Sequence, residues 1–587
     1  MDYLKLIKES KRIIGNPNGY PAIKIAVLGD NATQQLVQVL RAYLYRQGVF
    51  ADIYEAEFDI IEQEIYNTES GLYGFKPEYV LVNVSVQKLR DRYYRVTEKD
   101  LARFTDVYRD FITGLWRRLG EKLHCRIVQN LFALPLERPL GSYTVKVRDS
   151  FYSLVSQINQ QIIEKAQDNK NVLLNDLEYV SSLVGRQHWF DEKLWVHGKL
   201  FCRPDYLPFI AKNVSDIILA GAGKSRKCIV LDLDNTLWGG IIGDDGMDNI
   251  EVGNEGLGEA YSLFQRYLLD LKKQGVILAV CSKNDRETAM EVFERHPGMV
   301  LRKADIAAFV INWEPKSENI KQIAKTLNIG LDAMVFVDDS AFERNQVRSM
   351  LPQVLVPEMP DDPAEFVPVL NQLNLFETTS ISEEDKKRSD FYRSESQREE
   401  VKAQFGSLEE YLKSLEMEAV FARFDQAHLP RIVQLIQRSN QFNLTTKRYN
   451  ERECEDFMKD TQQCHPFYVT LQDKFGDSGL ISVIILKKEG EKILVDEWLM
   501  SCRVLSRGVE QFAMNKVVET ARNLNCRRVE GRYIPSAKNK MVSRFYEQFG
   551  FKEEGVTPEG TVWGLDVREY EPRQVWITEN SGQKCPA

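Results

Sequence analysis

The chain has 587 residues, of which 43% are hydrophobic and 28% charged, with a formal net charge of -9. This length exceeds one ordinary domain and predicts about three or four domains in a soluble globular protein. The negative balance argues against general nucleic-acid binding and gives no attraction to anionic membranes.

Cysteine spacing and hydropathy exclude further classes. The nine cysteines are odd in number and never spaced C-x-x-C, which disfavours a disulfide framework or a zinc site. The first residues lack the apolar core of a signal peptide, and no stretch approaches the roughly 20 apolar residues of a membrane span. We therefore expect a cytoplasmic protein that binds neither nucleic acid nor membranes.

In residues 1–222, apolar runs alternate with helical patterns. The predicted elements are a lead helix (1–15), strands at 22–28, 79–84 and 123–128, and a helix at 33–46. The first strand ends in Gly29-Asp30-Asn31. Alternating strands and helices predict a separate α/β layer structure.

The central region carries two carboxylates at the end of an apolar run. Lys227 to Gly240 reads K-C-I-V-L-D-L-D-N-T-L-W-G-G, which predicts Asp232 and Asp234 at the carboxyl end of a buried strand. Alternation in an extended chain places both carboxylates on one side. One carboxylate can attack phosphorus while the other handles the leaving-group proton. Two anions facing a phosphate need a hard cation such as Mg²⁺.

Later segments supply the remaining parts of a phosphate site. A strand at 276–281 ends at Ser282, and Lys316 lies near the start of a helix, where it can hold a phosphate oxygen. A strand at 333–337 ends in Asp338 and Asp339, a carboxylate pair suited to a metal site. Together these motifs are a specific signal for a phosphate site, whereas any one of them alone would be weak.

The four motifs resemble those of the haloacid dehalogenase (HAD) superfamily of phosphotransferases. D-L-D-N-T-L-W-G-G, V-C-S-K-N-D and F-V-D-D-S-A-F-E-R resemble its FkbH-like branch, in subfamily IIIC, and the likeness extends over most of the chain. It implies a HAD domain at 223–372 with a lidless Rossmann-like fold. The implied roles are a nucleophile (Asp232), a general acid/base (Asp234), phosphate ligands (Ser282, Lys316) and a magnesium site (Asp232, the Asp234 carbonyl, Asp338 and, through water, Asp339).

Lids of this superfamily are inserted after the first motif or between the second and third. Here the interval 238–258 holds a short G-D-D-G hairpin-like turn, and 283–314 has room for one helix and one strand. Neither interval can hold a lid domain. We expect an open site that suits a large substrate, or a neighbouring domain as lid.

Three residues beside these motifs have two readings each. Cys281 directly precedes Ser282 and is a candidate acyl acceptor, but strand alternation favours a thiol turned into the core. Trp238 and Trp313 are expected to be packing residues rather than substrate platforms.

The N-terminal region resembles the SGNH (GDSL-type) hydrolase fold that precedes the HAD unit in long FkbH-like proteins. That fold delivers a serine after Gly-Asp, whereas this chain has Asn31, which cannot form an acyl intermediate. Thr33 and His197 are alternatives, but a threonine there more often caps the helix and a lone histidine is more often structural. We expect a non-catalytic domain that binds a substrate or partner, or shields the next active site.

A charged segment, 373–417, follows the HAD region and is predicted to be an exposed helical connector. Its run from Glu383 to Arg388 mixes both signs, and Ser407 with Glu410 begins a short helix. In residues 418–575 the predicted elements are strands at 468–472, 478–487 and 493–500, and a helix at 508–524. This α+β order resembles the GNAT acyltransferase fold, which binds the pyrophosphate of coenzyme A at a Gly-rich turn.

The acyl site implied by that resemblance is incomplete. Gly508 keeps part of the turn, but Glu510 stands where a small residue is expected and Leu505 where Gln or Arg is usual. An anion beside a pyrophosphate is unfavourable, so a carrier protein's phosphopantetheine arm, or simple docking, competes with coenzyme A. Tyr546 is the candidate acid, although an aromatic in F-Y-x-x-x-G-F is also typical of a core.

The favoured function is a Mg²⁺-dependent HAD phosphatase or phosphotransferase acting on a phosphorylated small molecule. FkbH-like relatives take a glyceryl unit from 1,3-bisphosphoglycerate, remove its phosphate and load the acyl group onto an acyl carrier protein. The alternatives are a plain phosphatase or acyl-modifying enzyme of surface-glycan or secondary-metabolite assembly, and a non-enzymatic scaffold that docks carriers.

Overall fold

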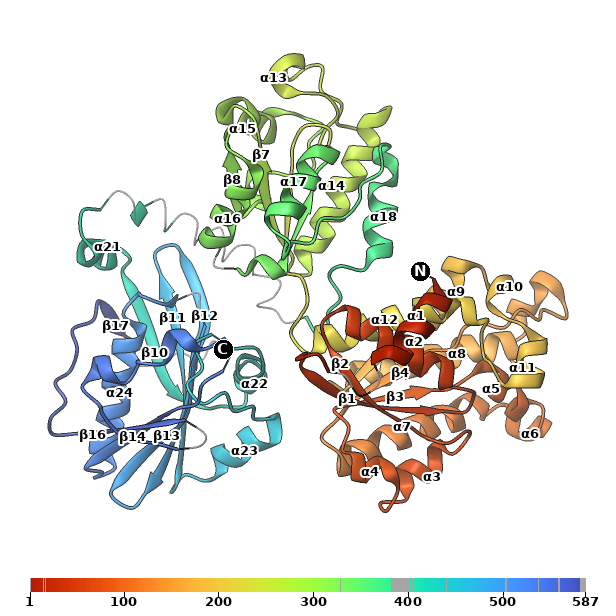
Figure 1. Ribbon diagram of the computed structural model, residues 1–587, viewed down its shortest axis with the longest axis horizontal. Coiled ribbons are helices and arrows are strands. Elements are labelled where there is room, and N and C mark those ends of the chain that lie inside the picture. Colours follow the sequence, from red (N-terminus) through yellow and green to blue (C-terminus); the bar gives the residue numbers. More distant parts are fainter. Residues whose placement is uncertain are drawn as a thin grey trace. The chain divides into compact units, whose positions relative to one another are not determined.

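The computed structural model in Figure 1 describes residues 2–13, 15, 17–327, 329–381, 394, 398, 401–402, 405–439, 441–501, 504–536, 538–557 and 560–580. The chain divides into two compact units, Met1–Ser225 with Phe376–Ser380 and Arg226–Leu375 with Ile381–Ala587. The predicted charged helix over Glu383 to Arg388 lies outside the described residues. None of the described helices combines the length and apolar character needed to cross a membrane.

The first unit is built on a parallel sheet with the strand order β2-β1-β3-β4-β5. Its strands are β1 (Ala22–Gly29), β2 (Phe50–Glu55), β3 (Tyr79–Asn83), β4 (Arg126–Asn130) and β5 (Val172–Asn175). Three of them were expected from their apolar runs. Strand β2 is only partly buried and β5 is four residues long, so neither has a strong sequence signal.

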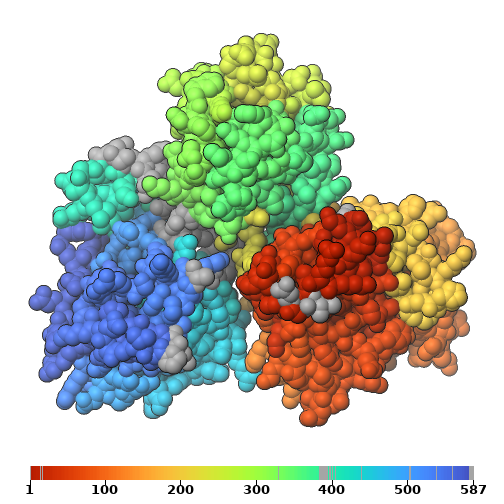
Figure 2. All heavy atoms as spheres, viewed as in Figure 1, coloured from red at the N-terminus to blue at the C-terminus, as the bar shows by residue number. Residues whose placement is uncertain are grey.

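Helices cover both faces of this sheet. They are α1 (Tyr3–Ile13), α2 (Gln34–Arg46), α3 (Ile61–Tyr66), α4 (Gly71–Phe75), α5 (Val86–Tyr93), α6 (Glu98–Leu101), α7 (Phe104–Lys122), α8 (Phe151–Gln167), α9 (Leu177–Val184), α10 (Arg186–Trp189), α11 (Glu192–Gly198) and α12 (Leu207–Gly221). Alternate residues of β1 enter two cores: Ile25 packs with α1, α2 and α12, and Ala26 with α3, α5, α7 and α8. Helix α1 lies at the surface of this unit, over α2 (Figure 2).

Four asparagines join the carboxyl ends of β1, β3, β4 and β5. The Asn31 amide donates to the Asn83 carbonyl at 2.8 Å, Asn130 donates to Asn83 at 2.5 Å, and Asn175 donates to Asn130 at 2.7 Å. All four side chains are buried. Asn31 therefore has a structural position. The expected cap at Thr33 is wrong in detail, because the Thr33 hydroxyl donates to Glu55 at 2.6 Å and makes no capping bond.

The second unit contains two further sheets, which confirms an α/β chain of several domains. The first is parallel, in the order β8-β7-β6-β9. Its elements are β6 (Cys228–Leu231), α13 (Ile242–Asp245), α14 (Leu257–Lys273), β7 (Ile277–Ser282), α15 (Arg286–Arg295), β8 (Ala308–Ile311), α16 (Lys316–Thr326), β9 (Met334–Val337), α17 (Ala341–Met350) and α18 (Phe366–Leu373). Helices α16 and α17 share a core with one face of the four strands.

The two intervals where lids are inserted are short and fully described. The G-D-D-G segment forms most of the one-turn helix α13, not a plain turn, and Gly239 pairs antiparallel with Glu251 at its base. Gly240 has φ +92°, and a Cβ there would lie 2.8 Å from the Asp245 carboxylate, so this tight return needs glycine. The second interval contains α15 and β8. Neither interval contains a separate lid domain.

The last sheet has the order β15-β16-β14-β13-β12-β11-β10-β17 and is mostly antiparallel. Its elements are α21 (Leu408–Ser414), β10 (Met417–Arg423), α22 (Leu429–Arg438), α23 (Glu451–Lys459), β11 (Cys464–Asp473), β12 (Gly476–Glu489), β13 (Lys492–Met500), α24 (Val509–Asn523), β14 (Arg528–Tyr533), β15 (Lys552–Val556), β16 (Thr561–Asp566) and β17 (Ile577–Glu579). As expected, Ser407 caps α21 by accepting a hydrogen bond from the Glu410 amide. Strands β13 and β14 run parallel through the crossover helix α24, and their pairing ends at Val495 and Gly531.

Candidate active site

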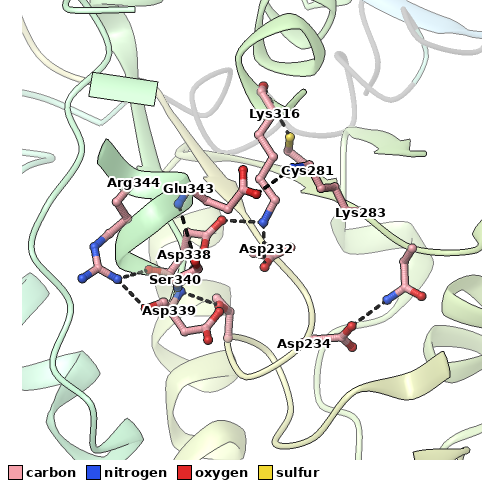
Figure 3. A network of polar contacts seen from close by, with 12 residues as sticks. Asp232, Asp234, Cys281, Lys283, Lys316, Asp338, Asp339, Ser340, Glu343 and Arg344 are labelled. Atoms are coloured by element: carbon pink, nitrogen blue, oxygen red, sulfur yellow. Dashed lines mark hydrogen bonds and ion pairs between the residues drawn. The ribbon is translucent and has the colours of Figure 1, made fainter. Parts of the chain in front are cut away.

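The predicted catalytic residues meet at the carboxyl edge of the sheet β8-β7-β6-β9. Asp232 and Asp234 follow β6, Ser282 ends β7, and Asp338 follows β9. Because these strands are parallel, their carboxyl ends lie at one edge of the sheet. Figure 3 shows Asp232, Lys316, Asp338 and Asp339 gathered there.

Lys316 binds two carboxylates at once. Its Nζ lies 2.8 Å from Asp232 Oδ2 and 2.5 Å from Asp338 Oδ2, and its side chain is 4% exposed. Burial by itself would lower the pKa of Lys316, but Asp232 and Asp338 together raise it above the usual value. Lys316 is therefore a permanent cation, which holds the two carboxylates close together.

The strand end after β9 is fixed by backbone contacts. The Ser340 amide donates to Asp338 Oδ1 at 2.9 Å, and the Asp339 amide donates to the Thr236 hydroxyl at 3.2 Å. Arg344 donates to the Asp338 and Asp339 carbonyls at 2.8 and 2.6 Å. Burial raises the pKa of Asp338 and of Asp339, and the nearby Asp232 carboxylate adds to this shift. A cation is needed to keep so many anions ionised together.

These carboxylates fit a divalent cation. Asp232, Asp338 and Asp339 each place one carboxylate oxygen within 4.8 Å of the others. Asp232 Oδ1 is buried and has no hydrogen-bond partner among the described residues. Carboxylate oxygens are the ligands that Mg²⁺ prefers. An unpartnered buried oxygen beside two further carboxylates is the donor set such an ion requires.

Asp234 has a different environment from Asp232. The expectation that both project from one extended strand is wrong, since β6 ends at Leu231 and a turn with Asn235 at φ +53° follows. Asp234 accepts hydrogen bonds from Trp238 Nε1 at 2.9 Å, from the Ile242 amide at 3.1 Å and from Asn284 at 2.8 Å. Burial raises its pKa although these bonds oppose the shift. A raised pKa suits a carboxyl that donates a proton.

Trp238, Asn284 and Arg344 contact the predicted site residues but were not predicted to do so. Trp238 is fully buried, as expected of a packing residue, and its indole N–H also fixes Asp234. Asn284 lies in the V-C-S-K-N-D motif and Arg344 in F-V-D-D-S-A-F-E-R. Their positions within the motifs could have indicated that Asn284 and Arg344 belong to the site. The groups that they contact depend on how the chain turns after β7 and β9, which the motifs do not show.

Trp313 is not a packing residue, contrary to expectation. Its side chain is 75% exposed and lies between Asn312 at the end of β8 and the start of α16. Phe342, at the start of α17, is 72% exposed. Both aromatics are thus free to meet a ligand near the edge that carries Asp338. Their exposure shows that neither is a core residue.

Trp313→Ala is expected to leave the thermal stability of the chain unchanged within about 0.5 kcal/mol, because an exposed side chain loses few contacts. If Trp313 contacts substrate, its loss raises KM for phosphate release while kcat stays nearly constant. Trp238→Ala is the comparison and should cost about 3–5 kcal/mol, because its buried ring leaves a cavity. Calorimetry measures the stability of the two variants, and steady-state kinetics measures KM. An unchanged KM in Trp313→Ala would show that Trp313 does not contact the substrate.

Ser282 and Cys281 occupy opposite sides of β7. Ser282 is buried at the strand end, beside Ile311 of β8. The Cys281 thiol is fully buried in the core and donates to the Lys316 carbonyl at 3.8 Å. Burial raises the pKa of this thiol. A neutral, enclosed thiol is a poor nucleophile, which disfavours the acyl-acceptor reading.

The turn before α24 differs from a free phosphate cradle. Gly508 is its N-cap, with φ +85°. Glu510 turns back and accepts a hydrogen bond from the Ser506 amide at 3.1 Å, and burial raises its pKa. Arg507 is buried and lies 3.6 Å from Asp473. An acidic side chain thus occupies the Ser506 amide of this turn.

Tyr546 is buried against Gly531 of β14 and beside Glu497 of β13. A Cβ on Gly531 would lie 2.3 Å from the tyrosine ring, so this close approach needs glycine. Neither the Tyr546 hydroxyl nor Glu497 Oε1 has a hydrogen-bond partner among the described residues. Burial raises the pKa of Glu497 to about 7, although Thr445 donates to its other oxygen at 2.8 Å. Sequence reasoning missed Glu497, because a lone acid within an apolar strand carries no motif.

Comparison with known proteins supports the central site. Residues 24–219 match the family described as FkbH, N-terminal domain. The N-terminal part of the protein BF1531 from Bacteroides fragilis, described as containing a phosphatase domain and complexed with Mg, is 39% identical. The match covers 65% of this chain and 100% of that structure, with a TM-score of 0.61. The chain belongs to the BF1531 family.

More distant structures match about a quarter of this chain. The ribosomal-protein-S18-alanine N-acetyltransferase of Escherichia coli is 12% identical, covering 25% of this chain and 94% of its own, with a TM-score of 0.21. The spermidine N-acetyltransferase of Vibrio cholerae, in complex with CoA and spermine, is 15% identical, covering 26% and 98%, with a TM-score of 0.21. No curated protein matches the sequence.

Proposed function

We propose that this chain is a Mg²⁺-dependent HAD-type phosphatase or phosphotransferase. The observation that carries the proposal is Asp232, which is held by Lys316 through one oxygen and has a second buried oxygen without a partner. The relative with a phosphatase domain complexed with Mg supports the same conclusion. A scaffold has no need of this costly arrangement of buried charges.

Asp232 is the proposed nucleophile. One carboxylate oxygen forms a bond to phosphorus, and the bond from phosphorus to the leaving oxygen breaks. Asp234, whose pKa is raised, gives its proton to that leaving oxygen. In the second half, Asp234 takes a proton from the attacking water, and the acyl phosphate on Asp232 is released as phosphate.

The remaining residues stabilise the charges of the phosphate and the metal, or keep Asp234 in position. Lys316 stabilises the phosphoryl oxygens, and Ser282 is placed at the same edge to donate to them. Asp232, the Asp234 carbonyl, Asp338 and Asp339 would hold Mg²⁺, which offsets the repulsion between the carboxylates and the phosphate. Asn284 and Trp238 keep Asp234 in position by donating to its carboxylate.

The finer proposal is that the substrate is an acyl phosphate of glyceryl type that also carries a phosphate ester, and that its acyl group passes to an acyl carrier protein. In the transfer, the thiol of the carrier attacks the acyl carbon, the bond from that carbon to the phosphate oxygen breaks, and phosphate leaves with the thiol proton. Asp232 acts separately, on the phosphate ester. The open site without an inserted lid, and its exposed aromatics, support a large partner. Coenzyme A or a phosphopantetheine arm would be the acyl carrier. A plain phosphatase acting in glycan or secondary-metabolite assembly is the alternative.

Intact-mass measurement separates these functions. This chain, a candidate carrier, Mg²⁺ and 1,3-bisphosphoglycerate are incubated, and released phosphate is followed in parallel. A glyceryl-sized adduct on the carrier supports acyl loading, and phosphate without an adduct supports a plain phosphatase. Phosphate release that persists without divalent cation would contradict the proposal.

A second candidate function is acyl transfer in the C-terminal sheet. Glu497 follows the last residue of β13 that pairs with β14, and the Tyr546 ring packs against Gly531, the last paired residue of β14. Each of the two side chains has one polar atom without a partner among the described residues. A carboxyl with a pKa near 7 suits a general base. Glu510 disfavours ordinary acetyl-CoA, so a carrier-bound acyl group is the favoured donor.

Glu497→Gln is expected to remove a pH dependence of stability. The Glu497 carboxyl has a pKa of 4.5 when unfolded and about 7 when folded, so the folded state binds the proton more tightly. Its stabilising contribution is present below pH 4.5 and falls by about 3 kcal/mol as the pH rises to 7. Hydrogen exchange of β13 should therefore slow in the variant above pH 7 and match wild type near pH 4.5. Exposed Glu491→Gln is the control; equal exchange in all three chains would contradict the burial argument.

A further inference from the structure

A cavity of about 240 Å³ lies in the first unit, at the carboxyl edge of its parallel sheet. It is bounded by α5, the segment after β4, the start of α8 and the start of α11. In open α/β sheets this edge is where ligands bind. None of the proposed phosphatase residues belongs to this unit.

The cavity is a binding site rather than a hydrolytic one. The asparagines at the strand ends are bonded to one another, so Asn31 is not presented to a ligand. The side chains that line the cavity include no serine, threonine, cysteine or histidine. The lining therefore lacks the hydroxyl, thiol or imidazole group on which a hydrolase of acyl compounds depends, and it is better suited to holding a ligand.

The walls of the cavity are apolar. Val86 and Pro135 are buried there, and the rings of Phe151 and Phe190 complete the lining. Apolar walls with a few polar groups are typical of small-ligand sites. The body of the ligand should therefore be hydrocarbon, and aromatic faces also favour a nearby cation.

The charged groups of the lining leave a negative excess. Arg90 forms ion pairs with Glu137 and with Glu192, the second at 3.1 Å. One guanidinium thus faces two carboxylates, and no other charged side chain lines the cavity. The lining carries a formal charge of -1, which repels anionic ligands and attracts cations.

Gln87 adds an acceptor that lacks a donor. Its side-chain nitrogen donates to the Phe201 carbonyl at 3.0 Å, which fixes the orientation of the amide. The Oε1 atom is consequently turned elsewhere, buried, and has no partner among the described residues. The residue is 4% exposed. Because Oε1 is closed to solvent, the acceptors that a ligand in the cavity can reach are the partly exposed carboxylates of Glu137 and Glu192, which call for a ligand that donates hydrogen bonds.

We propose that this cavity binds a small primary amine with an apolar body, such as an arylalkylammonium ion. The ammonium group supplies hydrogen-bond donors to the carboxylates of Glu137 or Glu192, and its charge balances the lining. The hydrocarbon body packs between Phe151 and Phe190. An acid of the same shape would bring a second negative charge and further acceptors, so the cavity discriminates against it.

The test compares two molecules of one shape and opposite charge. Binding of 2-phenylethylamine and phenylacetate to the full chain is measured by saturation-transfer NMR and calorimetry at low ionic strength. We expect the amine to bind about tenfold more tightly than the acid, since partly exposed ion pairs contribute modestly. Equal binding, or no binding of the amine, would overturn the proposal.

The double variant Glu137→Gln with Glu192→Gln tests the cause of the preference. Both glutamates are exposed, so the fold should be kept, and the lining charge changes to +1. The preference should reverse, with phenylacetate now bound more tightly than the amine. The exposed Glu121→Gln variant should keep the wild-type preference. Amine binding that persists in the double variant would overturn the assignment to this cavity.

The amine proposal stands apart from the phosphatase proposal. Asp232→Asn should bind 2-phenylethylamine as wild type does, because Asp232 belongs to the other unit. Weaker binding to Asp232→Asn would place the amine at the phosphatase site and overturn the proposal. The absence of phosphatase activity would leave the binding result unaffected.

Discussion

Asp232→Asn is expected to reduce Mg²⁺-dependent phosphate release about a thousandfold or more, because an amide oxygen cannot replace the attacking carboxylate. The fold should remain stable. Lys316 keeps its 2.5 Å contact with Asp338, and the repulsion between two buried carboxylates disappears. Phosphate release and thermal unfolding of the purified chain measure the two effects.

The matched control is Asp270→Asn, which changes an exposed aspartate of α14. Its activity and melting temperature should equal those of wild type. If Asp232→Asn keeps more than a tenth of the wild-type rate, Asp232 is not the nucleophile, and the proposed two-step mechanism is wrong.

Lys316→Met is expected to abolish phosphate release and to destabilise its domain by about 3–5 kcal/mol, because two buried carboxylates lose their common cation. The repulsion between the two carboxylates is then no longer offset, and protonation of Asp338, whose pKa is already raised by burial, relieves it. The deficit should therefore shrink as the pH falls, and Mg²⁺ should stabilise the variant more than wild type. Thermal unfolding at several pH values, with and without Mg²⁺, measures this.

Lys325→Met, near the end of the same helix and exposed, is the control and should leave stability and activity unchanged. A Lys316→Met chain that is as stable as wild type at neutral pH without Mg²⁺ would show that the carboxylates do not depend on Lys316. A chain that is destabilised but indifferent to Mg²⁺ would contradict the placement of the metal.

The central site could be predicted well because its signals are local. Each apolar run ends in a polar residue of the right chemistry, and parallel strands bring such ends to one edge. Asp232, Ser282, Lys316 and Asp338 were found in this way. The turn after β6 could not be predicted, because the left-handed Asn235 and the bonds of Asp234 arise only when the loop packs on Trp238 and Asn284.

Side-chain burial was harder to predict than strand position. Trp313 follows an apolar strand and reads as a core residue, yet it is 75% exposed, because the chain turns at Pro315 into α16. Glu497, a lone acid within an apolar strand, is buried beside Thr445 and Tyr546. Burial depends on which elements cover a position, and this is not encoded locally.

The sequence by itself determined the α/β class, the strands with strong apolar runs and the chemistry at the strand ends of the central sheet. These depend on neighbours within a few residues, through hydrophobic periodicity and turn-forming residues. Only the tertiary structure decided that Lys316 joins two carboxylates, that four asparagines from separate strands share a ladder, and that Gln87 and Glu192 line one cavity. The physical reason is that strand order and helix packing set these contacts between residues far apart in the chain, where local sequence gives no register.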